Sequence, residues 1–293
     1  MKDALRLLVY LAATILLGAL LAPVIFWAAQ SAPVRGLVPS LADVDFERFF
    51  RRALLFGAVV LLWPLLRAVR VRNMRDLELD PNPHWKRALM GGFLLAAIPL
   101  FCGGAGLIAC RVYALQPATD LIPFAKLILT TAAVPLIEET FFRGLILGVL
   151  LRTGHKYMSI FLTSVLYSLV HFLKAPEQTS TIVAWTSGFS SIAHAFAQFS
   201  DLMPVAAGFA TLFLIGWILA DARMRTRSLW LPIGLHAGWI FASGAFNRIA
   251  ELQVVVLPWL GRNLLVGIIP LGLGCLTWLI MRGWLSYYGN AKT

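Results

Sequence analysis

The chain has 293 residues, of which 59% are hydrophobic and only 13% are charged, and its mean hydropathy is +0.79. Soluble globular domains contain about a quarter charged residues, so this composition excludes an ordinary soluble protein. The net charge of +11 does not indicate a nucleic-acid-binding protein, because the lysines and arginines gather at the ends of apolar stretches, as they do in membrane proteins.

Apolar stretches long enough to cross a membrane recur along the whole chain. A helix that spans the bilayer needs about 20 mostly apolar residues. About eight such stretches follow one another, at 5–29, 50–69, 88–110, 121–151, 157–173, 203–221, 229–247 and 263–286. They predict an all-α polytopic membrane protein of about eight transmembrane helices.

The distribution of basic residues predicts how these helices are oriented. Lysines and arginines concentrate before the first stretch, after the second, fourth and sixth, and after the last. Because positively charged loops stay in the cytoplasm, these segments should all lie on the cytoplasmic side. We therefore expect both termini in the cytoplasm. The Ala-, Leu- and Trp-rich composition leads us to expect a bacterial inner (plasma) membrane.

The fourth stretch contains three ionisable residues in the segment "PLIEETFFRGLILGVLL", residues 135–151. Ionisable residues inside a membrane span are functional candidates by default. Glu139 and Arg143 are four residues apart and should form an internal ion pair that supports the helix bundle. Glu138 is rotated by about 100° from Glu139 and cannot easily share the same arginine. A desolvated carboxyl of this kind is suited to accept and return a proton.

Two histidines lie in other apolar stretches. His171 ends the fifth stretch, and His236 lies in the seventh between Gly234 and Gly238, where small residues let another helix approach closely. A single histidine in such a place is more often a packing residue than a catalyst. Two histidines and the carboxyl of Glu138, on three separate spans with few other buried charges, together predict one shared site.

Three short motifs resemble those of a known protease family. "EETFFR" is similar to the EExxxR motif of the CAAX-protease and bacteriocin-processing (CPBP) family of intramembrane proteases. "YSLVH" resembles its second motif, usually FxxxH, with Tyr167 in place of phenylalanine. "TRSLWLPIGLHAGW" resembles the segment with the third motif, HxxxN. The three occur in the family's order, and the resemblance extends over about residues 121–247.

The resemblance implies hydrolysis of a peptide bond within a membrane-embedded cavity. It implies that Glu138 activates the attacking water, that His171 helps to position this water, and that His236 helps to stabilise the oxyanion. By the same resemblance, Glu139 and Arg143 shape the site. The expected activity is that of an intramembrane endopeptidase of the glutamic or metallo type, acting on a membrane-associated substrate.

The third motif departs from the family pattern. The asparagine expected four residues after His236 is Ile240 here. Asn247 cannot replace it within the same helix, because eleven residues at the helical rise place it roughly 16 Å away. One oxyanion donor is therefore missing or supplied elsewhere, and a missing donor can lower the rate by about 10²–10³-fold.

These observations predict three segments and leave two other functions open. The segments are N-terminal transmembrane helices at 1–120, a CAAX-protease-like core at 121–247 and a C-terminal transmembrane helix at 248–293. A non-catalytic scaffold or immunity protein on the same fold is one alternative, which the missing asparagine slightly favours. A proton-coupled transporter is the other, although no repeat symmetry between the two halves supports it.

We expect no cofactor, although zinc is possible. A catalytic zinc site usually has three protein ligands and a water, and only Glu138, His171 and His236 are available. Zinc-binding histidines also usually have a partner such as a carboxylate on their second nitrogen, and the sequence offers no spare buried carboxylate. The expected partners are membrane lipids and a membrane-anchored or hydrophobic peptide or protein, with no nucleic acid.

Overall fold

The computed structural model describes residues 2–41, 44–80, 82–116, 121–172, 182–197, 202–254, 258–261, 264 and 266–290. These residues are almost entirely helical. They form two compact units, the first made of residues 1–72 with 170–201 and the second of residues 73–169 with 202–293. Glu138, Glu139, Arg143 and His236 belong to the second unit, whereas His171 is grouped with the first.

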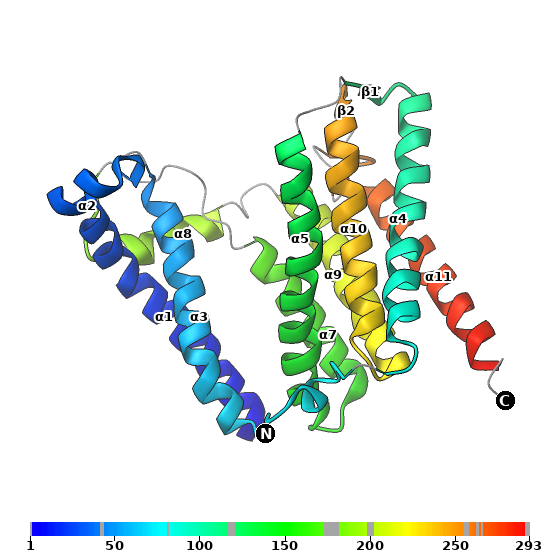
Figure 1. The fold of residues 1–293 in the computed structure, drawn as a ribbon, viewed down its shortest axis with the longest axis horizontal. Coiled ribbons are helices and arrows are strands. Elements are labelled where there is room, and N and C mark those ends of the chain that lie inside the picture. The colour runs from blue at the N-terminus through cyan, green and yellow to red at the C-terminus, as the bar shows by residue number, and fades with distance from the viewer. Residues whose placement is uncertain are drawn as a thin grey trace. The chain divides into compact units, whose positions relative to one another are not determined.

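The first unit is built around two long antiparallel helices, α1 (Lys2–Gln30) and α3 (Phe46–Ala68), which lie side by side in Figure 1. Small and aromatic side chains fill their interface, including Ala19, Ala22, Ala53, Phe46 and Phe50. The unit is completed by the shorter elements α2 (Ala32–Leu37), η1 (Pro39–Leu41) and α8 (Ser187–Ala197), of which α8 packs against α1.

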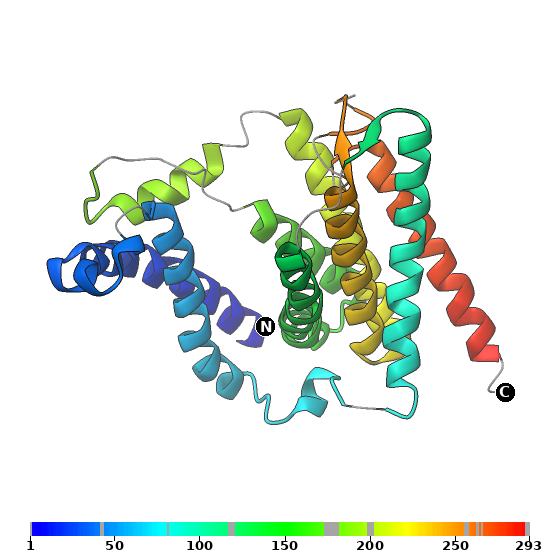
Figure 2. The ribbon, with the colours of Figure 1, turned by 45° about the horizontal axis from the view of Figure 1, so that its top comes forward.

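The second unit contains the remaining helices of the described chain. In order they are η2 (Met74–Leu77), α4 (Trp85–Ala109), α5 (Leu121–Glu139), a π-helix (Thr140–Ile146), α6 (Leu147–Leu151), α7 (Lys156–Phe172), α9 (Leu202–Thr226), α10 (Trp230–Ile249) and α11 (Ile268–Asn290). Helix α10 is central, with α5 on one side and α4 on the other (Figures 1 and 2). All nine residues from Leu231 to Trp239 are buried, and His236 is the one ionisable residue among them.

Glycines set the close contact between α4 and α10. A Cβ atom added to Gly92 would lie 2.6 Å from the carbonyl oxygen of Leu231, and one added to Gly238 would lie 2.9 Å from the Cβ atom of Ala96. A Cβ atom on Gly234 would overlap the backbone carbonyl of Leu89. The expectation that the small residues beside His236 admit another helix is confirmed, and the partner is α4. This contact fixes the rotation of α10 about its axis.

A short antiparallel ribbon joins the ends of α4 and α10. Strand β1 (Tyr113–Leu115) pairs with β2 (Ala250–Leu252), with Tyr113 opposite Leu252 and Leu115 opposite Ala250. The apolar stretches in the sequence predict helices alone, so this ribbon was not expected. Each strand follows the end of one of two neighbouring helices, so their backbones emerge side by side and satisfy each other's hydrogen bonds.

The eight predicted spans all correspond to helical segments. Five described helices are long and apolar enough to cross a membrane, at Lys2–Gln30, Phe46–Ala68, Trp85–Ala109, Val205–Thr226 and Ile268–Tyr287. The other three predicted spans form α5 to α6, α7 and α10, which contain the candidate site residues. The chain is therefore an all-α polytopic membrane protein, as predicted.

Candidate active site

The helix that contains both glutamates changes its winding directly after them. Helix α5 ends at Glu139, and a π-helical stretch from Thr140 to Ile146 follows before α6 begins. The hydroxyl of Thr140 donates a hydrogen bond of 2.6 Å to the carbonyl oxygen of Leu136. A π-helix is wider than an α-helix, and single π turns are frequent at functional sites. Hydrophobic periodicity does not distinguish such a widened turn from an α-helix, so no pattern in the sequence predicted it.

Glu139 and Arg143 form the predicted ion pair. The Nη1 atom of Arg143 lies 2.8 Å from Oε1 of Glu139, and both side chains are fully buried. The Nη2 atom of Arg143 also donates to the carbonyl oxygen of Gly216 in α9, at 3.3 Å. The guanidinium lies 4.3 Å from the centre of the Tyr167 ring in α7. Arg143 therefore connects the π-helical turn to two neighbouring helices.

Glu139 has a second partner that the sequence did not reveal. Its Oε1 atom lies 2.8 Å from Nδ1 of His236, a residue 97 positions away in the chain. A carboxylate ionised by its pairing with Arg143 can only accept hydrogen bonds, so Nδ1 of His236 carries the hydrogen. The expectation that no buried carboxylate is available to a histidine was therefore wrong. The same oxygen of Glu139 serves both Arg143 and His236.

Glu138 lies on the other side of the His236 ring. Its Oε2 atom is 3.9 Å from Nε2 of His236, and 27% of its side chain is exposed, compared with none of the Glu139 side chain. This distance is too long for a direct hydrogen bond, and the Oε2 atom itself is buried. Because Nδ1 carries the hydrogen, Nε2 of the neutral ring is an acceptor that faces Glu138.

Tyr167 completes the wall of this cluster. Its ring is nearly perpendicular to that of His236, with an angle of 82° and 6.2 Å between ring centres. It makes a similar edge contact with Phe142, at 5.2 Å, and only 2% of it is exposed. The aromatic residue before the second-motif histidine therefore contacts both Arg143 and His236 with its ring.

The structure brings four of the five predicted site residues together: Glu138, Glu139, Arg143 and His236. His171 follows Tyr167 by four residues on α7, which is about one helical turn. It is grouped with the first compact unit, so its convergence with the other four stays a prediction.

Ile240 and Asn247, the two residues considered for the asparagine of the third motif, lie at different positions along α10, as the helical rise predicts. Ile240 is half-buried one turn after His236 in α10. Asn247 is exposed near the other end of this helix, where its backbone carbonyl accepts a hydrogen bond of 3.3 Å from the Gln116 side chain. Asn247 therefore does not take the place of the asparagine that is absent at position 240.

The fit of a metal ion to this site is incomplete. Among the residues that the structure describes, no group of three or more histidine, cysteine, aspartate or glutamate side chains is arranged to hold one. Glu138 and Nε2 of His236 would offer two ligands, and Glu139 would support the histidine through Nδ1. A third ligand would have to be His171. We therefore derive no catalytic step through a metal.

Comparison with known proteins identifies the segment that contains the site. Residues 120–242 match the family model described as "Type II CAAX prenyl endopeptidase Rce1-like". This segment includes all three motifs and Ile240, and the resemblance to the CAAX-protease family is confirmed. No curated protein and no solved structure matches the chain.

Proposed function

We propose that this integral membrane protein, whose residues 120–242 form a segment of the Rce1-like type II CAAX prenyl endopeptidase family, is an intramembrane endopeptidase. The observation that carries the proposal is the arrangement of two adjacent glutamates on the two nitrogens of His236. A half-buried carboxylate, an oriented imidazole and a buried ion pair are the parts that a water-activating hydrolase needs.

In the proposed reaction, Glu138 accepts a proton from a water molecule while the water oxygen attacks the carbonyl carbon of the scissile bond. The peptide C–N bond then breaks, and the nitrogen of the leaving amine receives the proton. No serine or cysteine nucleophile is required. His171, if it reaches the same cavity, would help to position the water.

His236 contributes through Nε2. Since its Nδ1–H is directed at Glu139, Nε2 can donate to an oxyanion only after it gains a proton of its own. The proton that Glu138 takes from water can pass to Nε2, which lies 3.9 Å from Oε2 of Glu138, and it returns from Nε2 to the nitrogen of the leaving amine when the C–N bond breaks. The resulting imidazolium would donate to the oxyanion, with Glu139 stabilising its positive charge. Glu139 and Arg143 are thus positioning residues rather than catalytic ones.

The proposed substrate is a membrane-anchored or hydrophobic peptide or protein that enters from the bilayer. The matched family is named for prenyl endopeptidases, and removal of a prenylated tail is one form of this activity. Processing of a peptide precursor or of another membrane protein uses the same chemistry. Because the site lies on helices of a membrane protein, any of these substrates would be presented by the lipid.

A non-catalytic membrane scaffold is the second candidate, and Ile240 is the observation that favours it. Loss of one oxyanion donor would slow the reaction, and a scaffold could tolerate that loss. The buried, fully oriented contact of Glu139 with both Arg143 and His236 favours the enzyme, because packing alone would not require two glutamates beside one histidine.

Peptidomics of cells separates the two functions. Membranes from cells that express the wild type, Glu138→Gln or the control Glu251→Gln would be compared, Glu251 being an exposed residue of β2. For a protease, we expect defined peptide termini that are present with the wild type and the control and absent with Glu138→Gln. Identical peptide sets in all three would support the scaffold.

A further inference from the structure

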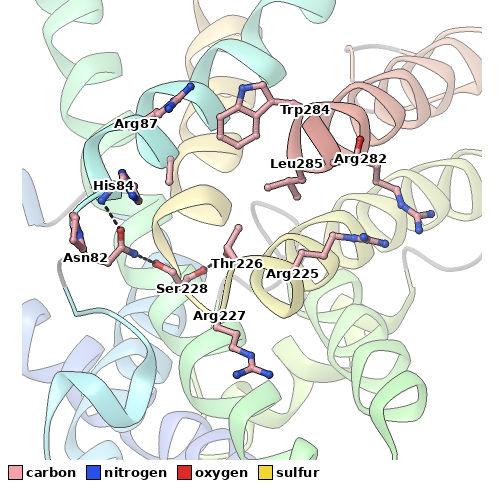
Figure 3. Close-up of a pocket in the computed structure, with 13 residues that line it drawn as sticks. Asn82, His84, Arg87, Arg225, Thr226, Arg227, Ser228, Arg282, Trp284 and Leu285 are labelled. Carbon is pink, nitrogen blue, oxygen red and sulfur yellow. Dashed lines mark hydrogen bonds between the residues drawn. The ribbon is translucent and has the colours of Figure 1, made fainter. Parts of the chain in front are cut away.

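A concave site lies in the same compact unit as His236, and His236 is not part of its lining. It is a pocket of about 1140 Å³, whose lining includes Arg87, Arg225, Arg227 and Arg282, with Trp284 and Leu285 on one wall. Figure 3 shows the four arginines around the pocket on three parts of the chain: Arg87 on α4, Arg225 in the last turn of α9 with Arg227 just after it, and Arg282 on α11. We call it the arginine pocket.

The arginine pocket lies where three apolar helices end. The spanning helix α4 begins at Trp85, the spanning part of α9 ends at Thr226, and that of α11 ends at Tyr287. Each of these ends is next to residues that line the pocket. The pocket is therefore at the level where lipid headgroups meet the hydrocarbon core.

The charge of the arginine pocket is strongly positive. None of the residues that line it is acidic, and all four arginines are exposed. Asp221, one turn before Arg225, pairs with that arginine at 3.0 Å, and Arg282 lies 5.2 Å from the Trp278 ring. Neither contact involves an acidic residue of the lining, so the wall of the pocket itself carries a net positive charge.

The backbone adds to this preference for an anion. Helix α4 starts at the pocket with its positive dipole end, and its N-cap residue, His84, makes no side-chain capping hydrogen bond. Amide groups at such a helix start, together with guanidinium groups, are suited to bind phosphate oxygens. Topology alone explains basic residues on one face of a membrane protein, but it does not explain their placement around a cavity.

The apolar wall indicates that the anion belongs to a lipid. Trp284 and Leu285 are half-buried, and the Trp284 ring packs against α4 at Gly91, where an added Cβ atom would lie 3.0 Å from the ring. Tryptophan is enriched where a protein meets the membrane–water interface. A soluble phosphate would use the arginines but leave this wall without a ligand.

We propose that the arginine pocket binds the phosphate-containing headgroup of an anionic glycerophospholipid from the adjacent leaflet. The arginines contact the phosphodiester oxygens, and Trp284 and Leu285 contact the glycerol and the first part of an acyl chain. Basic pockets between transmembrane helices are a recognised setting for such headgroups. The site is independent of the proposed peptidase activity.

The test is lipid binding by the full-length protein in neutral detergent micelles, followed by thermal unfolding during titration with phosphatidylglycerol or phosphatidylcholine. The double variant Arg227→Gln/Arg282→Gln is compared with Arg152→Gln/Lys156→Gln, whose two exposed charges lie outside the pocket. We expect phosphatidylglycerol, and not phosphatidylcholine, to stabilise the wild type. Binding should weaken about thirtyfold in the pocket variant and less than threefold in the control.

Three results would overturn the proposal: equal weakening in both double variants, equal stabilisation by the two lipids, or stabilisation by soluble glycerol phosphate that matches phosphatidylglycerol at the same concentration. The last result would assign the pocket to a soluble phosphate. If the glutamine variant unfolds without lipid, Arg227→Lys/Arg282→Lys replaces it. That variant keeps the charge but not the planar guanidinium fork, and we expect about tenfold weaker binding, whereas wild-type binding would contradict a bidentate phosphate contact.

Discussion

Glu138 and Glu139 are neighbours in the chain, but they differ in how far their side chains are exposed and in which groups they contact. Glu139 is fully buried and holds both Arg143 and His236 through one oxygen atom. Glu138 is partly exposed and faces the other nitrogen of His236 at 3.9 Å. One glutamate is thus suited to fix the geometry, and the other can reach water and a substrate.

The buried position of Glu139 predicts a loss of stability when its charge is removed. Glu139→Gln leaves Arg143 without a buried counter-charge, which we expect to lower the free energy of unfolding by about 3–5 kcal/mol. Asp3→Asn is the control, because it breaks an exposed pair with Arg6 worth at most about 1 kcal/mol. Thermal unfolding in the same detergent measures both. If Glu138→Gln keeps wild-type turnover while Glu139→Gln has normal stability but loses cleavage, the roles of the two glutamates are reversed.

Ile240 gives a second prediction for a single residue. Ile240→Asn restores an amide one turn from His236, and we expect it to raise the cleavage rate by at least about tenfold, since a full oxyanion donor contributes about 10²–10³. Ile249→Asn, at the exposed end of the same helix, is the control and should leave the rate unchanged. The measurement is the turnover rate of a substrate found by peptidomics. An unchanged rate in Ile240→Asn would mean that another group already supplies the donor.

At the scale of helices, the packing of α10 against α4 controls where His236 points. The glycines at 92, 234 and 238 let the two backbones approach, so α10 has one permitted rotation. A helix that could turn about its axis would separate His236 from Glu139. The site therefore depends on a contact that involves none of its own side chains.

The dependence of the site on the contact between α4 and α10 can be tested by adding one methyl group at this contact. In Gly238→Ala, the new Cβ atom would lie 2.9 Å from that of Ala96 and closer still to the carbonyl oxygen of Phe93. We expect overpacking to cost about 1–3 kcal/mol of stability and to lower cleavage as His236 moves. In the control Gly272→Ala on α11, the added atom meets nothing within 4 Å. Unfolding temperatures and cleavage rates would be measured for both, and wild-type values for Gly238→Ala would refute the dependence.

Local patterns in the sequence were enough to predict the helices and the Glu139–Arg143 pair. Runs of apolar residues identified eight helical segments, and five described helices are long and apolar enough to cross a membrane. The spacing of four residues placed the two charges together. The contact of Glu139 with His236 joins residues 97 positions apart and depends on how α10 turns against its neighbours, so no local pattern contains it. The π-helical turn after Glu139 could not be predicted either, because its sequence is as apolar as that of a membrane α-helix.

At the scale of the whole molecule, the chain is an integral membrane protein with two compact units, and its orientation remains a prediction from its basic residues. We expect both termini in the cytoplasm. The test introduces a cysteine at either terminus after replacement of the exposed Cys102, Cys110 and Cys275. A membrane-impermeant thiol reagent should label neither terminus in intact spheroplasts and both after permeabilisation. Labelling of either terminus in intact spheroplasts would contradict the orientation.

We propose that Glu138 activates water for peptide hydrolysis without a metal ion. The most direct measurement is the cleavage rate of a peptidomics-identified substrate by purified protein in lipid nanodiscs, after exhaustive chelation and with metal content determined. We expect the chelated wild type and Glu251→Gln to cleave at the untreated rate, and Glu138→Gln to lose at least about 10²-fold. Wild-type turnover by Glu138→Gln would contradict the claim, as would near-stoichiometric zinc with activity that is lost on chelation and restored only by zinc.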